Sequence, residues 1–169
     1  MKLFKQSIIA ATTTFVSILP VQASNNSIIE LTFVDSQIQC GANAPQLEIS
    51  ANVYHNGTLI KEKLSVGDSI LVPSLDGLTM TYEAVNAGCS LAKPTEFHLT
   101  KALLSKYYSW FESKAGAYEQ DSVISIMNGL PNYKDLYLVE LGSTNPSSKY
   151  FDLQDAIFIV NNNPQVFSD

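Results

Sequence analysis

The chain has 169 residues, of which 46% are hydrophobic, and its 16 acidic residues outnumber its 10 basic ones, so its formal net charge is −6. It contains no arginine, the residue best suited to paired contacts with phosphates, and an acidic chain repels phosphate backbones. We therefore expect no nucleic-acid partner. The scattered lysines also form no basic cluster for an anionic membrane surface.

Residues 1–23 have the pattern of a secretory signal peptide. Lys2 and Lys5 precede an apolar run over residues 7–19, and the segment ends in small residues. The run contains three threonines and falls short of the roughly 20 apolar residues of a membrane span. We expect cleavage after residue 23, which leaves residues 24–169 as a single globular domain of 146 residues. Both charges lost with the signal are lysines, so the net charge of this domain is −8.

Alternating apolar and polar residues predict strands through most of the remaining chain. Asn56-Gly57 lies between two of these segments and is the strongest short signal for a hairpin turn. Gly, Pro, Asn and Ser separate the others. The predicted strands cover residues 28–34, 46–55, 58–64, 69–72, 78–85, 122–127, 136–141 and 156–160.

The segment 100–114 has helical spacing instead. Leu104, Tyr108 and Phe111 fall on one side of such a helix, and Thr100 is placed to cap its first turn. A strand through its aromatic residues is the alternative, but the flanking Ala, Leu, Lys and Glu residues favour the helix. We expect a mainly β fold, all-β or α+β: an antiparallel β-sandwich or open barrel of about 7–8 short strands with one inserted amphipathic helix near 100–114.

Cys40 and Cys89 are the only cysteines. An even pair in an exported chain is most simply a disulfide, and a bridge that closes a loop of about fifty residues would contribute roughly 4 kcal/mol. The alternatives are a redox pair and a zinc site, but the spacing is not Cys-x-x-Cys and the chain offers only two histidines as further ligands. We expect a structural disulfide, no metal and no cofactor.

The tetrapeptide at residues 67–70, Gly-Asp-Ser-Ile, resembles the Gly-Asp-Ser-Leu block that carries the nucleophile in a family of secreted lipases and esterases. That family takes its base from an Asp-x-x-His element near the C-terminus, whereas the last histidine here is His98, and Thr95 stands three residues before it. The chain also lacks the family's alternation of strands and helices. We interpret the segment as a turn that leads into a strand, with Ser69 as a secondary nucleophile candidate.

Other titratable side chains are candidates for chemistry. Glu96 and His98 share a face if their segment is extended, which would suit acid–base work or a metal ligand, although a surface ion pair is the more common role. His55 precedes the Asn-Gly turn and is predicted to be a solvated strand end. Asp152 and Asp155 offer oxygen ligands for calcium without an EF-hand pattern, so solvated loop charges are the favoured interpretation.

Aromatic residues concentrate in the second half of the chain. On the predicted helix, Tyr107 and Trp110 point away from the side expected to be core, and exposed tryptophan with tyrosine is common on glycan and protein contact surfaces. The loops 128–132 and 142–148 are rich in Asn, Ser, Gly and Pro, which is typical of surface loops that carry recognition.

We therefore favour binding over catalysis. The sequence predicts an exported bacterial domain, periplasmic or extracellular, that binds a protein or a glycan through Trp110 and Tyr107 and is not inserted in the membrane after signal cleavage. The first alternative is a small secreted hydrolase with a loop-built site that uses His98. The second is a structural or assembly subunit that uses an exposed strand edge.

Overall fold

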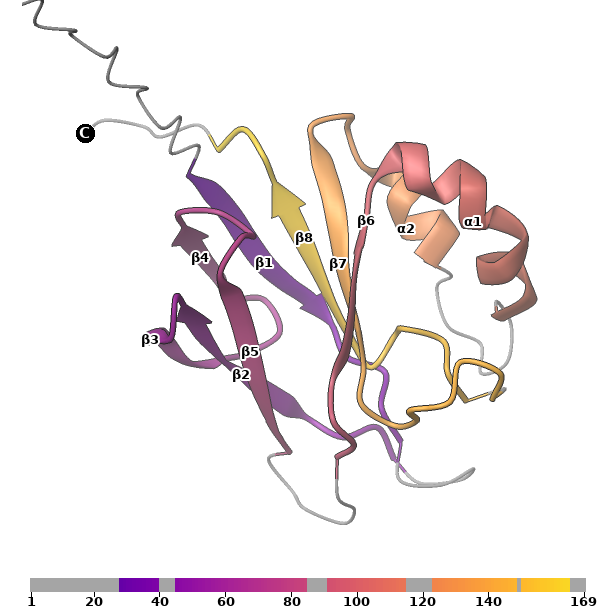
Figure 1. Ribbon diagram of the computed structural model, residues 1–169, viewed down its shortest axis with the longest axis horizontal. Helices are drawn as coiled ribbons and strands as arrows, with labels where there is room; N and C mark the ends of the chain where they lie inside the picture. The colour runs from indigo at the N-terminus through magenta and orange to yellow at the C-terminus, as the bar shows by residue number, and fades with distance from the viewer. Residues whose placement is uncertain (1–27, 40–44, 85–90, 115–122, 149, 165–169) are drawn as a thin grey trace, which may run out of the picture.

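The computed structural model describes residues 28–39, 45–84, 91–114, 123–148 and 150–164, which form three layers (Figure 1). A five-stranded antiparallel sheet is the middle layer. A three-stranded antiparallel sheet covers one of its faces, and two helices pack on part of the other. This arrangement confirms the predicted mainly β, sandwich-like fold.

The five-stranded sheet joins segments from both ends of the described chain. In spatial order it contains β4 (Ser69–Val72), β1 (Ile29–Asp35), β8 (Ala156–Asn161), β7 (Lys134–Glu140) and β6 (Thr95–Leu99). Nearly every residue of β7 and β8 is buried, because the sheet is covered on both faces at these strands. β4 and β6 are its edge strands.

The three-stranded sheet has the order β3 (Thr58–Leu64), β2 (Ile49–His55), β5 (Leu78–Ala84). Between β2 and β3, Asn56 and Gly57 have φ values of 49° and 76°. Two positive φ values in a two-residue connection are typical of the type I′ turn, whose twist matches that of the flanking strands. The predicted Asn-Gly hairpin is confirmed.

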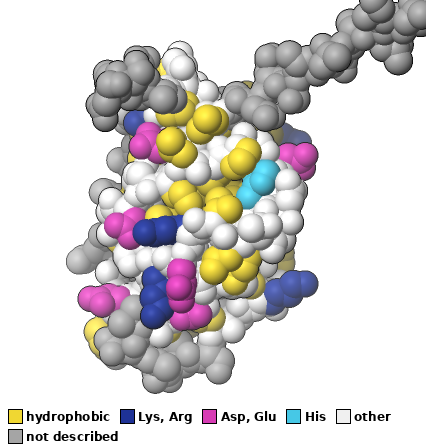
Figure 2. Space-filling view, turned by 90° about the vertical axis from the view of Figure 1, so that its left-hand side faces the viewer, with side chains coloured by type: hydrophobic (Ala, Val, Ile, Leu, Met, Phe, Trp, Pro, Cys, Tyr) yellow, Lys and Arg dark blue, Asp and Glu magenta, His cyan; other side chains and the backbone are white. Residues whose placement is uncertain are grey.

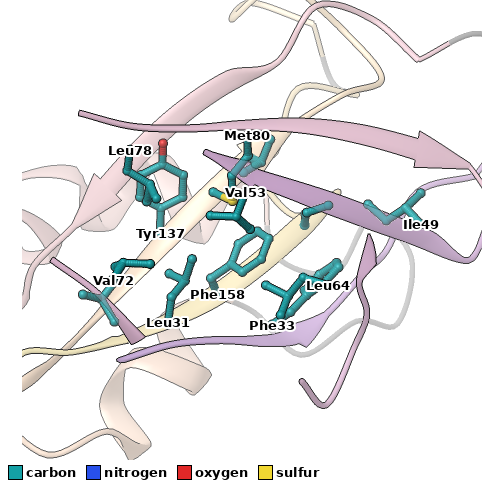
Figure 3. Close-up of a cluster of buried hydrophobic side chains, with 14 of the residues drawn as sticks. Leu31, Phe33, Ile49, Val53, Leu64, Val72, Leu78, Met80, Tyr137 and Phe158 are labelled. Carbon is teal, nitrogen blue, oxygen red and sulfur yellow. The ribbon is translucent and has the colours of Figure 1, made fainter. Parts of the chain in front are cut away.

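The first core lies between the two sheets (Figure 3). The rings of Phe33 and Phe158 stack with their centroids 4.4 Å apart, and Leu31 and Val53 point into the same space. All four side chains are fully buried. The apolar faces that alternation predicts for β1 and β2 are therefore the faces that meet.

The second core lies between the five-stranded sheet and the helices α1 (Lys101–Lys114) and α2 (Val123–Gly129). Its fully buried members are Leu99, Met127, Leu136, Leu138 and Ile157. At the start of α1, the Leu103 N–H donates to Thr100 Oγ1 at 3.2 Å. The predicted helix and its cap are therefore confirmed.

The prediction of a strand over residues 122–127 is wrong, because the structure has α2 from Val123 and hence a second helix. Val123, Ile124 and Met127 are buried, and this spacing places them on one side of a short helix. The β-branched side chains of Val123 and Ile124 favour strands, but packing against the sheet decides the conformation of so short a segment.

β6 lies where no strand is predicted. Its apolar residues Phe97 and Leu99 pack in the second core, whereas Glu96 and His98 point to the opposite face. The segment is extended, so Glu96 and His98 share a face, as the sequence predicts for an extended segment. The five residues of β6 give too short an alternation to be distinguished from a loop.

The predicted signal peptide, Cys40 and Cys89 lie outside the described residues, so signal cleavage and the disulfide stay predictions. Within the described segments, neither helix is long and apolar enough to cross a membrane.

Candidate functional site

A pocket of about 190 Å³ lies between α1, β6 and the loop that joins β7 to β8. Its walls are almost entirely apolar. They are formed by Phe97, Tyr107, Trp110, Phe111, Pro146 and Leu153. Both side chains that the sequence predicts to bind, Trp110 and Tyr107, therefore lie in this pocket, and the loop flagged as a recognition surface contributes Pro146.

The helix places three of these rings by its periodicity. Tyr107, Trp110 and Phe111 stand at positions i, i+3 and i+4 and so share a face. Phe111 is buried and anchors α1 in the second core, whereas Tyr107 and Trp110 are half-buried and can be reached from solvent. The predicted core side of this helix is therefore wrong in part. Tyr108, predicted to be core, is 44% exposed on the outer side, whereas Tyr107 and Trp110, predicted to point away from the core, pack against the second core.

The aromatic rings hold one another in fixed orientations. The Phe97 and Tyr107 rings meet edge to face, with centroids 5.5 Å apart and planes at 89°. The Trp110 ring meets Phe111 at 4.9 Å and 84° and Phe151 at 6.3 Å and 72°. Such T-shaped pairs are the favoured geometry for aromatic side chains, so these contacts stabilise the rings in the orientation that shapes the pocket.

The loop between β7 and β8 is fastened by one buried carboxylate. Glu140 is fully buried, and its Oε1 accepts hydrogen bonds from the N–H groups of Gly142 (3.0 Å) and Ser143 (2.8 Å). Its Oε2 accepts from the N–H groups of Asp152 (3.0 Å) and Leu153 (3.2 Å). One side chain therefore ties both ends of the loop to the end of β7.

Leu153 is a strained part of the pocket wall. Its φ is 62°, in the left-handed region that non-glycine residues rarely adopt. Its N–H is held by Glu140, and its side chain is 5% exposed. Because such a conformation persists only where the surroundings determine it, the Glu140 contacts position this wall of the pocket.

A second carboxyl group lies beside Glu140. Asp155 Oδ2 accepts hydrogen bonds from the N–H groups of Leu141 (2.5 Å) and Gly142 (2.6 Å). Burial, followed by the nearby Asp155 charge, raises the pKa of Glu140 to about 8, and burial also raises the pKa of Asp155. Burial and the Asp155 charge raise the pKa of Asp152 to about 6. The pair Glu140–Asp155 therefore holds a proton at neutral pH.

Two lysines lie over the aromatic walls. Lys106 Nζ is 5.3 Å from the centroid of the Tyr107 ring, and Lys114 Nζ is 5.3 Å from that of Trp110. Lys114 also donates to the Ser148 carbonyl at 2.7 Å. These cation–π contacts place positive charge beside an otherwise apolar pocket.

His98 lies on the other face of β6. Its Nε2 is 3.3 Å from Asp135 Oδ2, so its carboxylate partner is Asp135 rather than Glu96. The same Oδ2 accepts a hydrogen bond from the Asn162 side chain at 2.8 Å. Glu96 accepts a hydrogen bond from the Tyr137 hydroxyl instead. Burial raises the pKa of Tyr137, and the hydrogen bond to Glu96 raises it further. The sequence missed Asp135, because its pairing depends on the register of β6 with β7.

The structure separates Ser69 from His98. Ser69 is on β4 and His98 on β6, the two opposite edges of the five-stranded sheet, which puts them about 19 Å apart at the usual strand spacing. Ser69 Oγ lies 2.8 Å from the Thr32 hydroxyl, on the face that the helices occupy. Gly67 has a φ of 94°, and Asp68 Oδ2 accepts from the Ser65 N–H, so the motif is the predicted turn.

A second histidine–serine contact was not predicted. His55 Nε2 lies 3.4 Å from Ser74 Oγ, and the Ser74 hydroxyl donates to the Asp76 carbonyl at 2.9 Å. Because the serine proton points to Asp76, His55 acts as the donor in this contact and is not placed to activate Ser74. Among the described residues, no group of three or more His, Cys, Asp or Glu side chains is arranged to hold a metal ion.

No known protein family, curated protein or solved structure matches this chain.

Proposed function

We propose that this chain is an exported binding domain that takes an apolar group of its partner into the aromatic pocket. The pocket itself is the observation that carries the proposal: about 190 Å³, lined by ring faces and edges that pack on one another. An apolar cavity of about 150 Å³ holds one benzene-sized molecule, whereas whole drug-sized ligands fill roughly 300 Å³ or more. The pocket therefore suits one ring or branched aliphatic group of a larger partner.

Export is part of the proposal and is supported by the signal-peptide pattern of residues 1–23 and by the cysteine pair. The domain would meet its partner in the periplasm or outside the cell.

The tryptophan in the pocket provides the test. Trp110 is the only tryptophan, so its indole Nε1–H gives a single resonance in an NMR spectrum of the mature chain. We expect titration with toluene to shift this signal in a saturable manner. A methyl glycoside, titrated separately, tests a sugar as the occupant.

Two exposed prolines supply a matched pair of variants. Pro146→Asp places a carboxylate in the pocket, and we expect it to weaken toluene binding by about tenfold or more because the charge loses hydration there. Pro131→Asp makes the same change at an exposed turn outside the pocket and should bind like the wild type. The proposal is overturned if neither toluene nor the glycoside shifts the Trp110 resonance. It is also overturned if Pro146→Asp and Pro131→Asp bind toluene equally well.

A second candidate role is assembly through strand edges, as the structural-subunit alternative requires. Figure 2 shows hydrophobic side chains gathered in the middle of the face where β3 and β4 lie, with charged side chains around them. Exposed apolar residues of this region are Leu59, Ile60, Val66 and Leu71. Sedimentation of a strict monomer at every concentration would exclude self-assembly, and a dimer lost in Leu71→Lys would support it.

A further inference from the structure

β6 is an edge strand, and the pocket lies against its helix-side face. In the part of the chain that the structure describes, β6 pairs with β7 alone, so its outer row of N–H and C=O groups has no strand partner. Of its five residues only Leu99 is buried. An unpaired edge of this kind accepts an extended peptide as an additional strand.

The register of such a strand would connect the edge to the pocket. Phe97 faces the helices and lines the pocket, where its ring meets Tyr107. Side chains on one face of adjacent strands lie about 5 Å apart, so a residue of an added strand opposite Phe97 would project its side chain beside the same ring. The pocket has room for one such side chain.

The lining favours an apolar side chain over a sugar. Its walls consist of aromatic rings, Pro146 and Leu153, which present almost no polar surface. A sugar ring in this space would leave hydroxyl groups without hydrogen-bond partners, and each buried unsatisfied group costs roughly 1–3 kcal/mol. A phenylalanine or leucine side chain has no such groups to satisfy.

The charges around the site favour acidic neighbours. α1 carries three lysines and a single acidic residue, Glu112, in a chain whose net charge is −6. Lys106 and Lys114 lie over pocket rings, and Lys93 and Lys101 flank the two ends of β6. Opposite charge on a partner would speed its association and fix its register.

Resting on the proposed function, we infer that the partner is an extended acidic peptide segment that pairs with the free edge of β6 and inserts one large apolar side chain into the aromatic pocket. Acids two residues before and after the apolar anchor would share its face and approach the α1 lysines.

Synthetic pentapeptides with blocked ends test this inference. The probe is Asp-Thr-Phe-Thr-Asp, compared with Asp-Thr-Ala-Thr-Asp and Lys-Thr-Phe-Thr-Lys, and the readouts are the Trp110 indole and β6 amide resonances of the mature chain. We expect the alanine peptide to bind about tenfold or more weakly, because its anchor side chain is lost. The lysine peptide should bind about three- to tenfold more weakly at low salt, and added salt should reduce the difference.

Backbone methylation tests the pairing itself. In an antiparallel ladder the N–H groups of alternate residues point to the same neighbour. One peptide is N-methylated at the two threonines, and a second is N-methylated at the phenylalanine and the two aspartates. We expect one of these peptides to bind normally and the other not to bind, because only one set of N–H groups points to β6. Equal tolerance of both patterns, or a lysine peptide that binds as well as the acidic one, overturns the inference.

The outcomes distinguish the inference from the function on which it rests. If toluene shifts the Trp110 signal and no peptide does, the pocket is a binding site and the peptide inference is wrong. If a methyl glycoside occupies the pocket and toluene does not, the peptide inference fails and so does the apolar occupant of the proposed function, and the pocket is a sugar-binding site. If nothing shifts Trp110, both fail.

Discussion

Glu140 and Asp155 form a buried carboxyl pair at the base of the loop that completes the aromatic pocket. Together they accept six hydrogen bonds from backbone N–H groups of residues 141–143, 152 and 153. Backbone N–H groups that are withdrawn from water need acceptors, and here two carboxyl side chains supply the acceptors that a neighbouring strand supplies within a sheet. The pocket wall at Leu153 therefore depends on residues that do not line the pocket.

Glu140→Ala should destabilise the domain, because the N–H groups of Ser143, Asp152 and Leu153 lose their acceptor and the Gly142 N–H keeps only Asp155. We expect a loss of about 3 kcal/mol in the free energy of unfolding, measured by urea denaturation, together with a change in Trp110 fluorescence as the loop loosens. Glu112→Ala removes an exposed carboxylate of α1 and should change the free energy by less than about 0.5 kcal/mol. Equal stability of the two variants would contradict this role of Glu140.

The same pair predicts an unusual dependence of stability on pH. The pKa of Glu140 is about 8 in the folded chain, above the ordinary value of 4.5, so the folded state binds more protons than the unfolded state between these limits. Stability from this group is therefore fully present below pH 4.5 and is lost as the pH rises through about 8. Asp152, with a folded-state pKa of about 6 against 3.8, acts in the same direction over a lower window.

Urea denaturation at intervals between pH 5 and pH 9 measures this slope. Asp155→Asn removes the neighbouring charge that contributes to the raised pKa of Glu140, so the stability of this variant should fall less steeply with pH than that of the wild type. Parallel pH profiles for the two proteins would show that the carboxyl groups do not share a proton.

His98→Ala separates the binding function from the hydrolase alternative. His98 lies on the face of β6 opposite to Phe97 and the pocket, and its ion pair with Asp135 is partly exposed. The substitution should leave toluene binding at Trp110 unchanged and cost about 1 kcal/mol or less in stability. Loss of a hydrolytic activity of the purified mature chain, with folding intact, would instead make His98 a catalytic residue.

The alternation of single strands predicts much of this fold, because each strand has one face on a core. The pattern of apolar residues and turn signals predicts every strand except β6, and the helical spacing predicts α1. It fails for α2 and β6, where a segment of five to seven residues is too short to show its period. In both cases contacts distant in sequence determine the conformation.

The residues of the candidate site likewise include some that a local sequence pattern predicts and others whose roles depend on contacts distant in sequence. The helical spacing predicts that Tyr107 and Trp110 lie on α1, but the prediction that they point away from the core is wrong, because they share the face of Phe111 and pack against the second core. The roles of Phe97, Leu153 and the Glu140–Asp155 pair could not be predicted, because they depend on the position of β6 at the sheet edge and on hydrogen bonds that span 12 to 14 residues. The acids that the sequence suggests as solvated loop charges include Asp155, which is buried and structural.

The disulfide between Cys40 and Cys89 stays a prediction from the sequence, because both cysteines lie outside the residues that the structure describes. We expect the mature chain from an oxidising compartment to show no free thiols with Ellman's reagent in denaturant, and two after reduction. Reduction should lower the free energy of unfolding by roughly 4 kcal/mol, as closure of a loop of about fifty residues implies. Two reactive thiols in the unreduced, exported protein would exclude the bridge, and retention of residues 1–23 in that protein would also contradict signal cleavage.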